Sequence, residues 1–169
     1  LLPDYYFVWD KMAFDTINGW SSNIMSHTPV ITGHLWHKYY YDNSSKLQIK
    51  CSEFIESISD DNINILFTMQ GFFDNVFPEI LHKAILKTKN INNIKWYVRL
   101  HPRYLDKDKI INKFLLSNKD LNNIEYENTT KASLLPLLNK MDYHLTCSSA
   151  AVYDADFSHV KNILLDIEG

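Results

Sequence analysis

The side chains best suited to chemistry follow a strand-like segment, residues 95–103 (KWYVRLHPR). Apolar and polar residues alternate along its first half, which is the periodicity of a β-strand. Pro102 cannot donate a hydrogen bond to a sheet, so we expect the strand to end just before it. Arg99, His101 and Arg103 then place three potential cations at a strand's carboxyl end, where open α/β sheets bind ligands. The segment is either a plain strand end with solvated arginines or one wall of an anion site.

Two serines after a later strand pattern are the second candidate for anion binding. Ser148 and Ser149 follow residues 143–147 (YHLTC), a predicted strand, and open a predicted helix that runs to about Phe157. Free backbone N–H groups at a helix start, hydroxyl donors and the helix dipole all favour an anion. Simple N-capping by serine is the alternative. Asp154 in the same helix could accept hydrogen bonds from ribose hydroxyls, or it is an ordinary exposed carboxylate.

Polar residues occupy all four of the predicted strand-to-helix junctions. They are TMQG at 68–71, HPR at 101–103, ENTT at 127–130 and TCSS at 146–149. Because the carboxyl ends of parallel strands share one edge of a sheet, these junctions are expected to line one site. Gln70 is the candidate ligand contact in the first of them.

Composition restricts the classes of function. The chain has 169 residues and a formal charge of −3, so bulk attraction to nucleic acid or to an anionic membrane is not indicated. Two cysteines make neither a disulfide framework nor a metal-ligand pattern, which favours a reducing, cytoplasmic setting. Membrane contact is expected to be peripheral at most, on the inner face. The sequence lacks GxGxxG, P-loop, GxSxG and zincin motifs, and we predict no metal and no cofactor.

Five strand patterns alternate with four helix patterns in the second part of the chain. The strands are predicted at 63–69, 94–100, 124–127, 143–147 and 160–166, and the helices at 76–87, 106–116, 133–141 (with Ser133 as its cap) and from Ser148. This alternation predicts an α/β fold with a doubly wound parallel sheet, Rossmann-like, and helices on both faces.

The first part of the chain is less regular. We predict a strand at 5–9, a helix from Asp10 through Asn18 that Gly19 ends, a strand at 29–36, a connector at 37–45 and a helix at 47–58. Residues 1–46 are expected to be inter-domain or packed on the sheet, and residues 47–169 to form the Rossmann-like domain. The chain is expected to be a fragment of a longer one.

The order of these motifs resembles the C-terminal, nucleotide-binding half of GT-B glycosyltransferases. The closest likeness is to bacterial enzymes of capsule, lipooligosaccharide and teichoic-acid synthesis, such as polysialyltransferases and CDP-glycerol glycerophosphotransferases. In those families a His-Pro and a Ser-Ser motif hold the donor nucleotide's phosphate and base, and His101-Pro102 and Ser148-Ser149 match them. An acidic residue followed by alanine often takes the ribose, and Asp154 stands there in place of the more usual glutamate.

The resemblance covers roughly residues 62–169 and implies transfer of a sugar or glycerol phosphate from a CMP-, CDP- or UDP-linked donor without a metal. His101 would be catalytic, stabilising the negative charge that grows on the leaving phosphate. The implied nucleotide and phosphate contacts are Arg99, Pro102, Arg103, Gln70, Ser148 and Ser149, with Asp154 on the ribose. The glycan or glycolipid acceptor and the general base would lie on an N-terminal domain mostly or wholly missing here, so this chain alone is expected to bind nucleotide weakly and to be inactive.

Two other functions remain open. A flavodoxin-like or receiver-like regulatory module shares the predicted fold, although a receiver's acidic cluster is missing at the first strand end, residues 68–70. A nucleotide-sugar epimerase of GT-B architecture would need additional acid and base carboxylates in the cleft, which the sequence does not identify.

Overall fold

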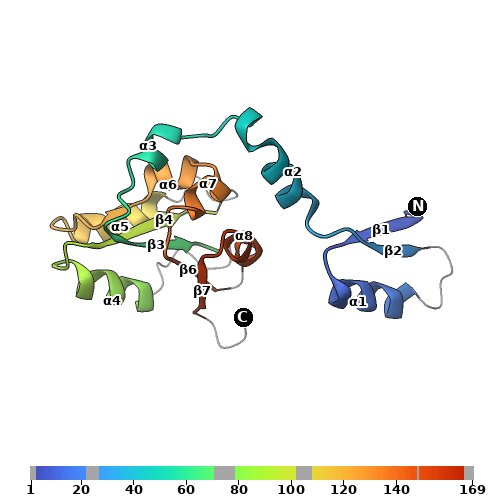
Figure 1. The fold of residues 1–169 in the computed structure, drawn as a ribbon. Helices are drawn as coiled ribbons and strands as arrows, with labels where there is room; N and C mark the ends of the chain where they lie inside the picture. The colour runs from blue at the N-terminus through green and yellow to red at the C-terminus, as the bar shows by residue number, and fades with distance from the viewer. Residues whose placement is uncertain (1–2, 22–26, 71–78, 102–107, 148, 166–169) are drawn as a thin grey trace. The chain divides into compact units, whose positions relative to one another are not determined.

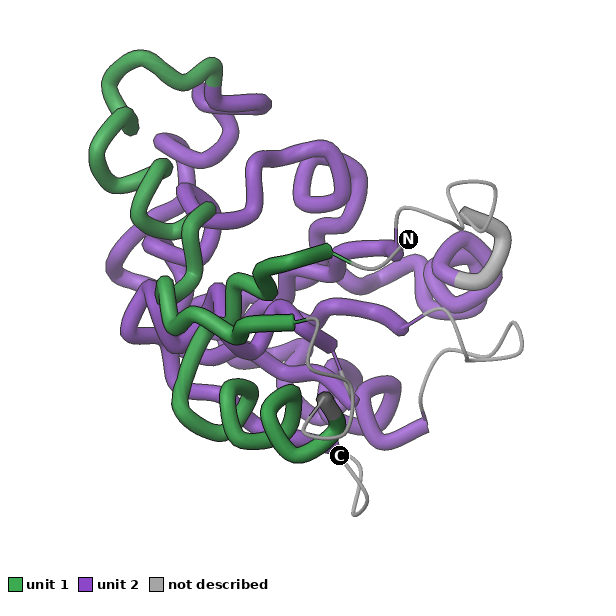
Figure 2. The backbone as a smooth tube through the Cα atoms, turned by 90° about the vertical axis from the view of Figure 1, so that its right-hand side faces the viewer, with its two compact units in different colours: residues 1–48 green, residues 49–169 purple. Residues whose placement is uncertain are grey.

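The computed structural model describes residues 3–21, 27–70, 79–101, 108–147 and 149–165. The chain divides into two compact units, residues 1–48 and residues 49–169, which Figure 2 colours separately. Each unit has a parallel sheet of its own. Along the described residues, no helix is both long and apolar enough to cross a membrane.

The first unit is a single βαβ motif followed by a helical segment. Its elements are β1 Tyr5–Val8, α1 Lys11–Ser21, β2 Thr28–Ile31, α2 Leu35–Asn43 and a 3-10 turn at Ser44–Lys46. Strands β1 and β2 pair in parallel. Asp10 caps α1 as expected, because its Oδ1 accepts a hydrogen bond from the Ala13 N–H at 2.8 Å. Gly19 does not end this helix, which continues to Ser21.

Residues 29–45 differ from the sequence prediction. The strand ends at Ile31 rather than at Trp36, because Gly33 has a φ of +70° and turns the chain out of the extended conformation. The predicted connector is instead the helix α2, which begins with His34 as its N-cap: the His34 Nδ1 accepts from the His37 N–H at 3.3 Å. The sequence did not predict this helix start, because histidine is an uncommon N-cap residue.

The second unit contains the predicted doubly wound sheet, shown in Figure 1. Its described strands are β3 Ile63–Thr68, β4 Ile94–Arg99, β5 Ile124–Glu125, β6 Tyr143–Thr146 and β7 Lys161–Leu164. All neighbours in this described sheet pair in parallel, in the order β5-β4-β3-β6-β7. This confirms the predicted fold class. From β3 the chain adds β4 and then β5 on one side of the sheet. It then crosses back and adds β6 and β7 on the other side of β3.

Helices cover both faces of this sheet (Figure 1). They are α3 Ser52–Glu56, α4 Glu79–Thr88, α5 Asp108–Ser117, α6 Glu127–Lys131, α7 Leu134–Leu138 and α8 Ala151–Phe157. One core joins α4 and α5 to side chains such as Phe67, Val98 and Leu145. The other joins α3, α7 and α8 to Leu66 and Tyr97. Burial on both faces explains why the central strands are almost wholly apolar.

Three local predictions in this unit are wrong. The helix expected at 47–58 is only α3, because Cys51 adopts a left-handed conformation (φ 57°) directly before it. Ser133 precedes α7, but its side chain does not cap the helix, since its hydroxyl accepts from the Lys50 N–H at 3.0 Å.

The third difference is at β5. This strand ends at Glu125, and a helix that was not predicted, α6, starts at Glu127. Glu125 stabilises the start of that helix, because its carboxylate accepts hydrogen bonds from the N–H groups of Asn128 and Thr129 at 2.8 and 2.9 Å.

Candidate functional site

The sheet order fixes where a ligand crevice can form. Strands β3 and β6 are neighbours, yet the chain leaves β3 toward β4 on one side and leaves β6 toward β7 on the other. The loops that follow β3 and β6 therefore diverge, which makes this the topological switch point of the sheet. Gln70 follows β3 and Ser149 follows β6, so the structure brings these two predicted residues to the same carboxyl edge.

Gln70 has hydrogen-bonding capacity to spare at this edge. Its Nε2 is buried and has no hydrogen-bond partner among the described residues. A buried amide donor without an acceptor costs about 1–3 kcal/mol, so such a group usually meets water or a ligand. The backbone beside it is fixed, since the Met69 N–H donates to the Arg99 carbonyl at 2.9 Å.

His101 follows β4, the neighbour of β3, and is half-buried. The preceding residue is anchored, because the Leu100 N–H donates to the Thr130 hydroxyl at 3.1 Å. Pro102 and Arg103, both predicted phosphate contacts, lie outside the described residues. The structure thus places the first member of the His-Pro motif one strand away from the switch point.

Arg99 is engaged within the protein. Its Nη1 donates to the carbonyls of Thr129 and Ala132, each at 2.7 Å, at the end of α6. Burial lowers the pKa of Arg99 below its ordinary value, and the negative charge of Asp154 opposes that shift. The guanidinium stays charged at neutral pH and neutralises the partial negative charge at the α6 carboxyl end. Its role as a phosphate contact remains a prediction.

The serine motif is described only in part. Ser148 lies outside the described residues, and α8 begins at Ala151, three residues later than the sequence indicated. The Ser149 hydroxyl accepts from the Ala151 N–H at 3.2 Å, so it satisfies one of the free donors at this helix start. The helix ends at Phe157, as predicted.

Asp154 lies on the α8 turn that follows the serine motif. Its charge acts on both Arg99 of β4 and His144 of β6. The carboxylate is therefore near the middle of the sheet and is only half exposed, unlike the exposed Asp156 beside it. Asp156 is therefore an ordinary exposed carboxylate, whereas Asp154 is not. Ribose binding by Asp154 remains a prediction.

Sequence reasoning missed a buried polar chain beneath this edge. The Thr68 hydroxyl lies 2.9 Å from His144 Nε2, and the His144 Nδ1 lies 2.7 Å from Asn162 Oδ1. The Thr146 hydroxyl donates to the Thr68 carbonyl at 3.1 Å. His144 is thus a fully buried residue of the sheet with both ring nitrogens in hydrogen bonds. The sequence signal for this network is the spacing of His144 and Thr146, because residues two apart in a strand lie on the same face of the sheet.

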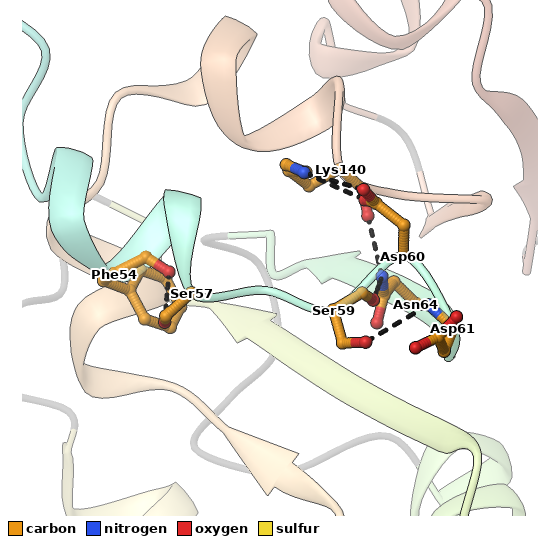
Figure 3. Close-up of polar contacts among 7 residues, drawn as sticks. All are labelled: Phe54, Ser57, Ser59, Asp60, Asp61, Asn64 and Lys140. Carbon is orange, nitrogen blue, oxygen red and sulfur yellow. Dashed lines mark hydrogen bonds and ion pairs between the residues drawn. The ribbon is translucent and has the colours of Figure 1, made fainter.

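The opposite, amino edge of the sheet has its own polar network (Figure 3). Asn64 at the start of β3 donates from Nδ2 to the carbonyls of Ser59 and Lys140, each at 3.0 Å, and its N–H donates to Asp142 Oδ2 at 2.7 Å. The Lys140 ammonium pairs with Asp60 at 2.9 and 3.1 Å. These contacts close the loops that enter β3 and β6. Asp60 itself is an exposed turn residue.

The chemistry available at the carboxyl edge is that of an anion or polar-ligand site. It offers an amide donor at Gln70, an imidazole at His101 and a hydroxyl at Ser149, with the carboxylate of Asp154 nearby. Among the described residues, no group of three or more histidine, cysteine or acidic side chains is placed to hold a metal ion. Comparison of the chain with models of known protein families gives no match, and comparison with curated protein sequences gives none either.

Proposed function

We propose that the second unit binds the nucleotide of an activated sugar or glycerol phosphate donor, as the donor domain of a metal-independent GT-B glycosyltransferase. The acceptor would be a glycan or glycolipid of a bacterial cell surface, held by another part of the enzyme. A cytoplasmic location belongs to the same proposal, since Cys51 and Cys147 are not joined in a disulfide.

The observation that carries the proposal is the unused Gln70 amide at the switch point. A phosphate oxygen or a base carbonyl would accept the hydrogen bond that Gln70 Nε2 otherwise lacks. The position is the one where doubly wound sheets bind nucleotides, between diverging loops at the carboxyl ends of two central strands. Ser149 on the neighbouring loop supplies a hydroxyl, and Asp154 lies one helical turn beyond it.

His101 supplies the catalytic part of the proposal. When the bond between sugar and phosphate breaks, negative charge grows on the departing nucleotide. A donated hydrogen bond or a positive charge from the His101 imidazole would stabilise that charge in the transition state more than in the ground state, which lowers the barrier. The role requires that the ring reach the phosphate, a geometry that a nucleotide complex would reveal.

Calorimetry or ligand-observed NMR with CMP, CDP, UDP and GDP tests the proposal. We expect at least one of them to bind the chain with a Kd of roughly 1 mM or tighter. Gln70→Glu should weaken that binding about tenfold, because it replaces the donor with a negative charge. The matched control is Asn92→Asp, which makes the same change of charge at an exposed residue before β4. Absence of binding by all four nucleotides would refute the donor-domain function and leave the regulatory-module alternative.

A further inference from the structure

A chain of buried hydrogen bonds crosses three strands directly beneath the proposed site. It runs from the Thr68 hydroxyl on β3 through the His144 ring on β6 to the Asn162 amide on β7. The Asn162 Nδ2 then donates to the Val152 carbonyl of α8 at 3.2 Å. Thr68 is 5 % exposed and His144 is fully buried, so solvent does not substitute for any link between them.

The partners fix the direction of every hydrogen bond. Because Asn162 donates from Nδ2 to a carbonyl, its Oδ1 faces His144 and can only accept. The His144 Nδ1 must therefore carry a proton. A neutral ring then has a lone pair on Nε2, which accepts the proton of the Thr68 hydroxyl. The hydrogen bonds thus place a proton on His144 Nδ1, so the neutral form of the ring is the Nδ1–H tautomer.

The surroundings keep His144 neutral. Burial lowers the pKa of the ring below its ordinary value, against the smaller opposing effects of the Asn162 hydrogen bond and the Asp154 charge. The groups that face it are the neutral hydroxyl of Thr68 on β3, the neutral amide of Asn162 on β7 and the carboxylate of Asp154 on α8. Protonation would turn Nε2 into a donor, so the Thr68 hydroxyl could no longer donate to it.

We infer that His144 is a positioning residue for the nucleotide site. By holding Thr68, it keeps Gln70, two residues further along the chain, in a fixed position relative to α8. This inference rests on the proposed function. Thr68 lies two residues before Gln70, while Val152 lies two residues before Asp154. The hydrogen-bonded chain therefore ties together the two segments on either side of the switch point. It does not touch the ligand, and it acts by fixing the position of Gln70 relative to α8.

The tautomer is testable without any ligand. Long-range ¹H–¹⁵N NMR spectra of the full chain should show His144 as a neutral Nδ1–H imidazole at pH 7. The same ring should remain neutral as the pH falls past about 6.5, the ordinary pKa of histidine. An Nε2–H tautomer, or protonation of His144 at that ordinary pKa, would overturn the hydrogen-bond directions on which the inference depends.

The functional part is tested with Thr68→Val and Thr68→Ser, using whichever nucleotide binds the unaltered chain most tightly. The isosteric valine removes the hydroxyl and should weaken nucleotide binding about three- to tenfold, while serine should restore it. Thr88→Val is the control, because it removes a hydroxyl that accepts from Trp96 Nε1 at 2.9 Å, far along the sequence from the site. Below about pH 6, binding by the unaltered chain should weaken and binding by Thr68→Val should change less.

The outcomes separate the two proposals. No nucleotide bound by the unaltered chain at any pH would refute the proposed function. Binding by the unaltered chain that is equally strong in Thr68→Val, with the same pH profile, would refute the positioning role of His144 and leave the nucleotide site intact. If Thr68→Val does not fold, Thr68→Ala takes its place, with Thr68→Ser as the rescue: affinity equal in Thr68→Ala and the unaltered chain would refute the positioning role, and loss in alanine with recovery in serine would support it.

Discussion

The two edges of the central sheet use buried polar groups in opposite ways. At the amino edge, Asn64 and Asp142 hold the loops that enter β3 and β6, and Asp60 pairs with Lys140 on the surface (Figure 3). At the carboxyl edge, Thr68 and His144 hold the strands, while a Gln70 amide beyond them is left without an acceptor among the described residues.

This difference indicates which edge is built for a ligand. Asn64 Oδ1 at the start of β3 and Asn123 Oδ1 directly before β5 also lack a partner among the described residues, so an unpartnered buried atom does not by itself mark the ligand edge. A single water can complete such a group. What distinguishes the carboxyl edge is the place of its unused donor, which lies at the switch point of the sheet, the position where doubly wound sheets bind ligands.

The largest expected effect is on stability, at Arg99. Replacing Arg99 by methionine leaves the carbonyls of Thr129 and Ala132 without their donor and should cost about 3 kcal/mol of unfolding free energy. Asn64→Ala, its counterpart at the amino edge, should cost about 2 kcal/mol and leave nucleotide affinity unchanged. Urea unfolding measures both, and an Arg99→Met protein of unaltered stability would contradict the structural assignment of Arg99.

The next effect is on ligand binding, at His101. His101→Ala should weaken nucleotide binding by about 2 kcal/mol, roughly thirtyfold, since it removes a hydrogen bond to a charged phosphate. Far-UV circular dichroism and the unfolding midpoint provide the control for folding. In an enzyme that includes the acceptor domain, the same change should abolish most transfer, and undiminished turnover would exclude a role for this ring in catalysis.

Acidification should reveal the buried histidine of the carboxyl edge. Because the pKa of His144 is lowered in the folded state, the unfolded chain binds more protons below about pH 6.5. The stability that His144 contributes is therefore complete above that pH and declines as the pH falls, by at most about 1.4 kcal/mol per pH unit. Urea unfolding at pH 7.5, 6.5 and 5.5 should show a flatter decline for His144→Gln than for the unaltered chain. His159→Asn, at an exposed position, is the control; equal slopes would mean that His144 is not held neutral.

The smallest effect is expected on the surface of the amino edge. Asp60→Asn removes an ion pair with Lys140 whose carboxylate is 78 % exposed, so it should change the unfolding free energy by less than about 0.5 kcal/mol. Nucleotide affinity should not change. If Asp60→Asn weakened nucleotide binding as much as His101→Ala, the claim that only the carboxyl edge binds nucleotide would be wrong.

Hydrophobic periodicity was enough to predict the sheet. The strands at 63–69, 94–100 and 143–147 are largely buried, and apolar residues make up most of each sequence, which leaves little choice of structure. Helices held by side-chain contacts rather than by an apolar stripe were missed. Helix α6 has the sequence ENTTK and depends on the Glu125 carboxylate, a contact that no periodicity encodes.

The candidate site was predictable in location but not in detail. Residue type and order placed Gln70, His101 and Ser149 at strand ends, which is where the structure has them. The partners of Arg99 were not predictable, because Thr129 and Ala132 reach it through a helix that the sequence did not indicate. Likewise His144 and Asn162 are 18 residues apart, and only the pairing of β6 with β7 brings them together.

The most direct test is to map nucleotide binding onto the two edges by NMR. The ¹⁵N-labelled chain is titrated with the tightest-binding of the four nucleotides, and backbone amide shifts are followed. We expect the largest changes at Gln70, His101 and Ser149, with Asn64 and Asp142 unaffected. Changes concentrated at Asn64 and Asp142, or spread evenly over both edges, would contradict a nucleotide site at the carboxyl edge.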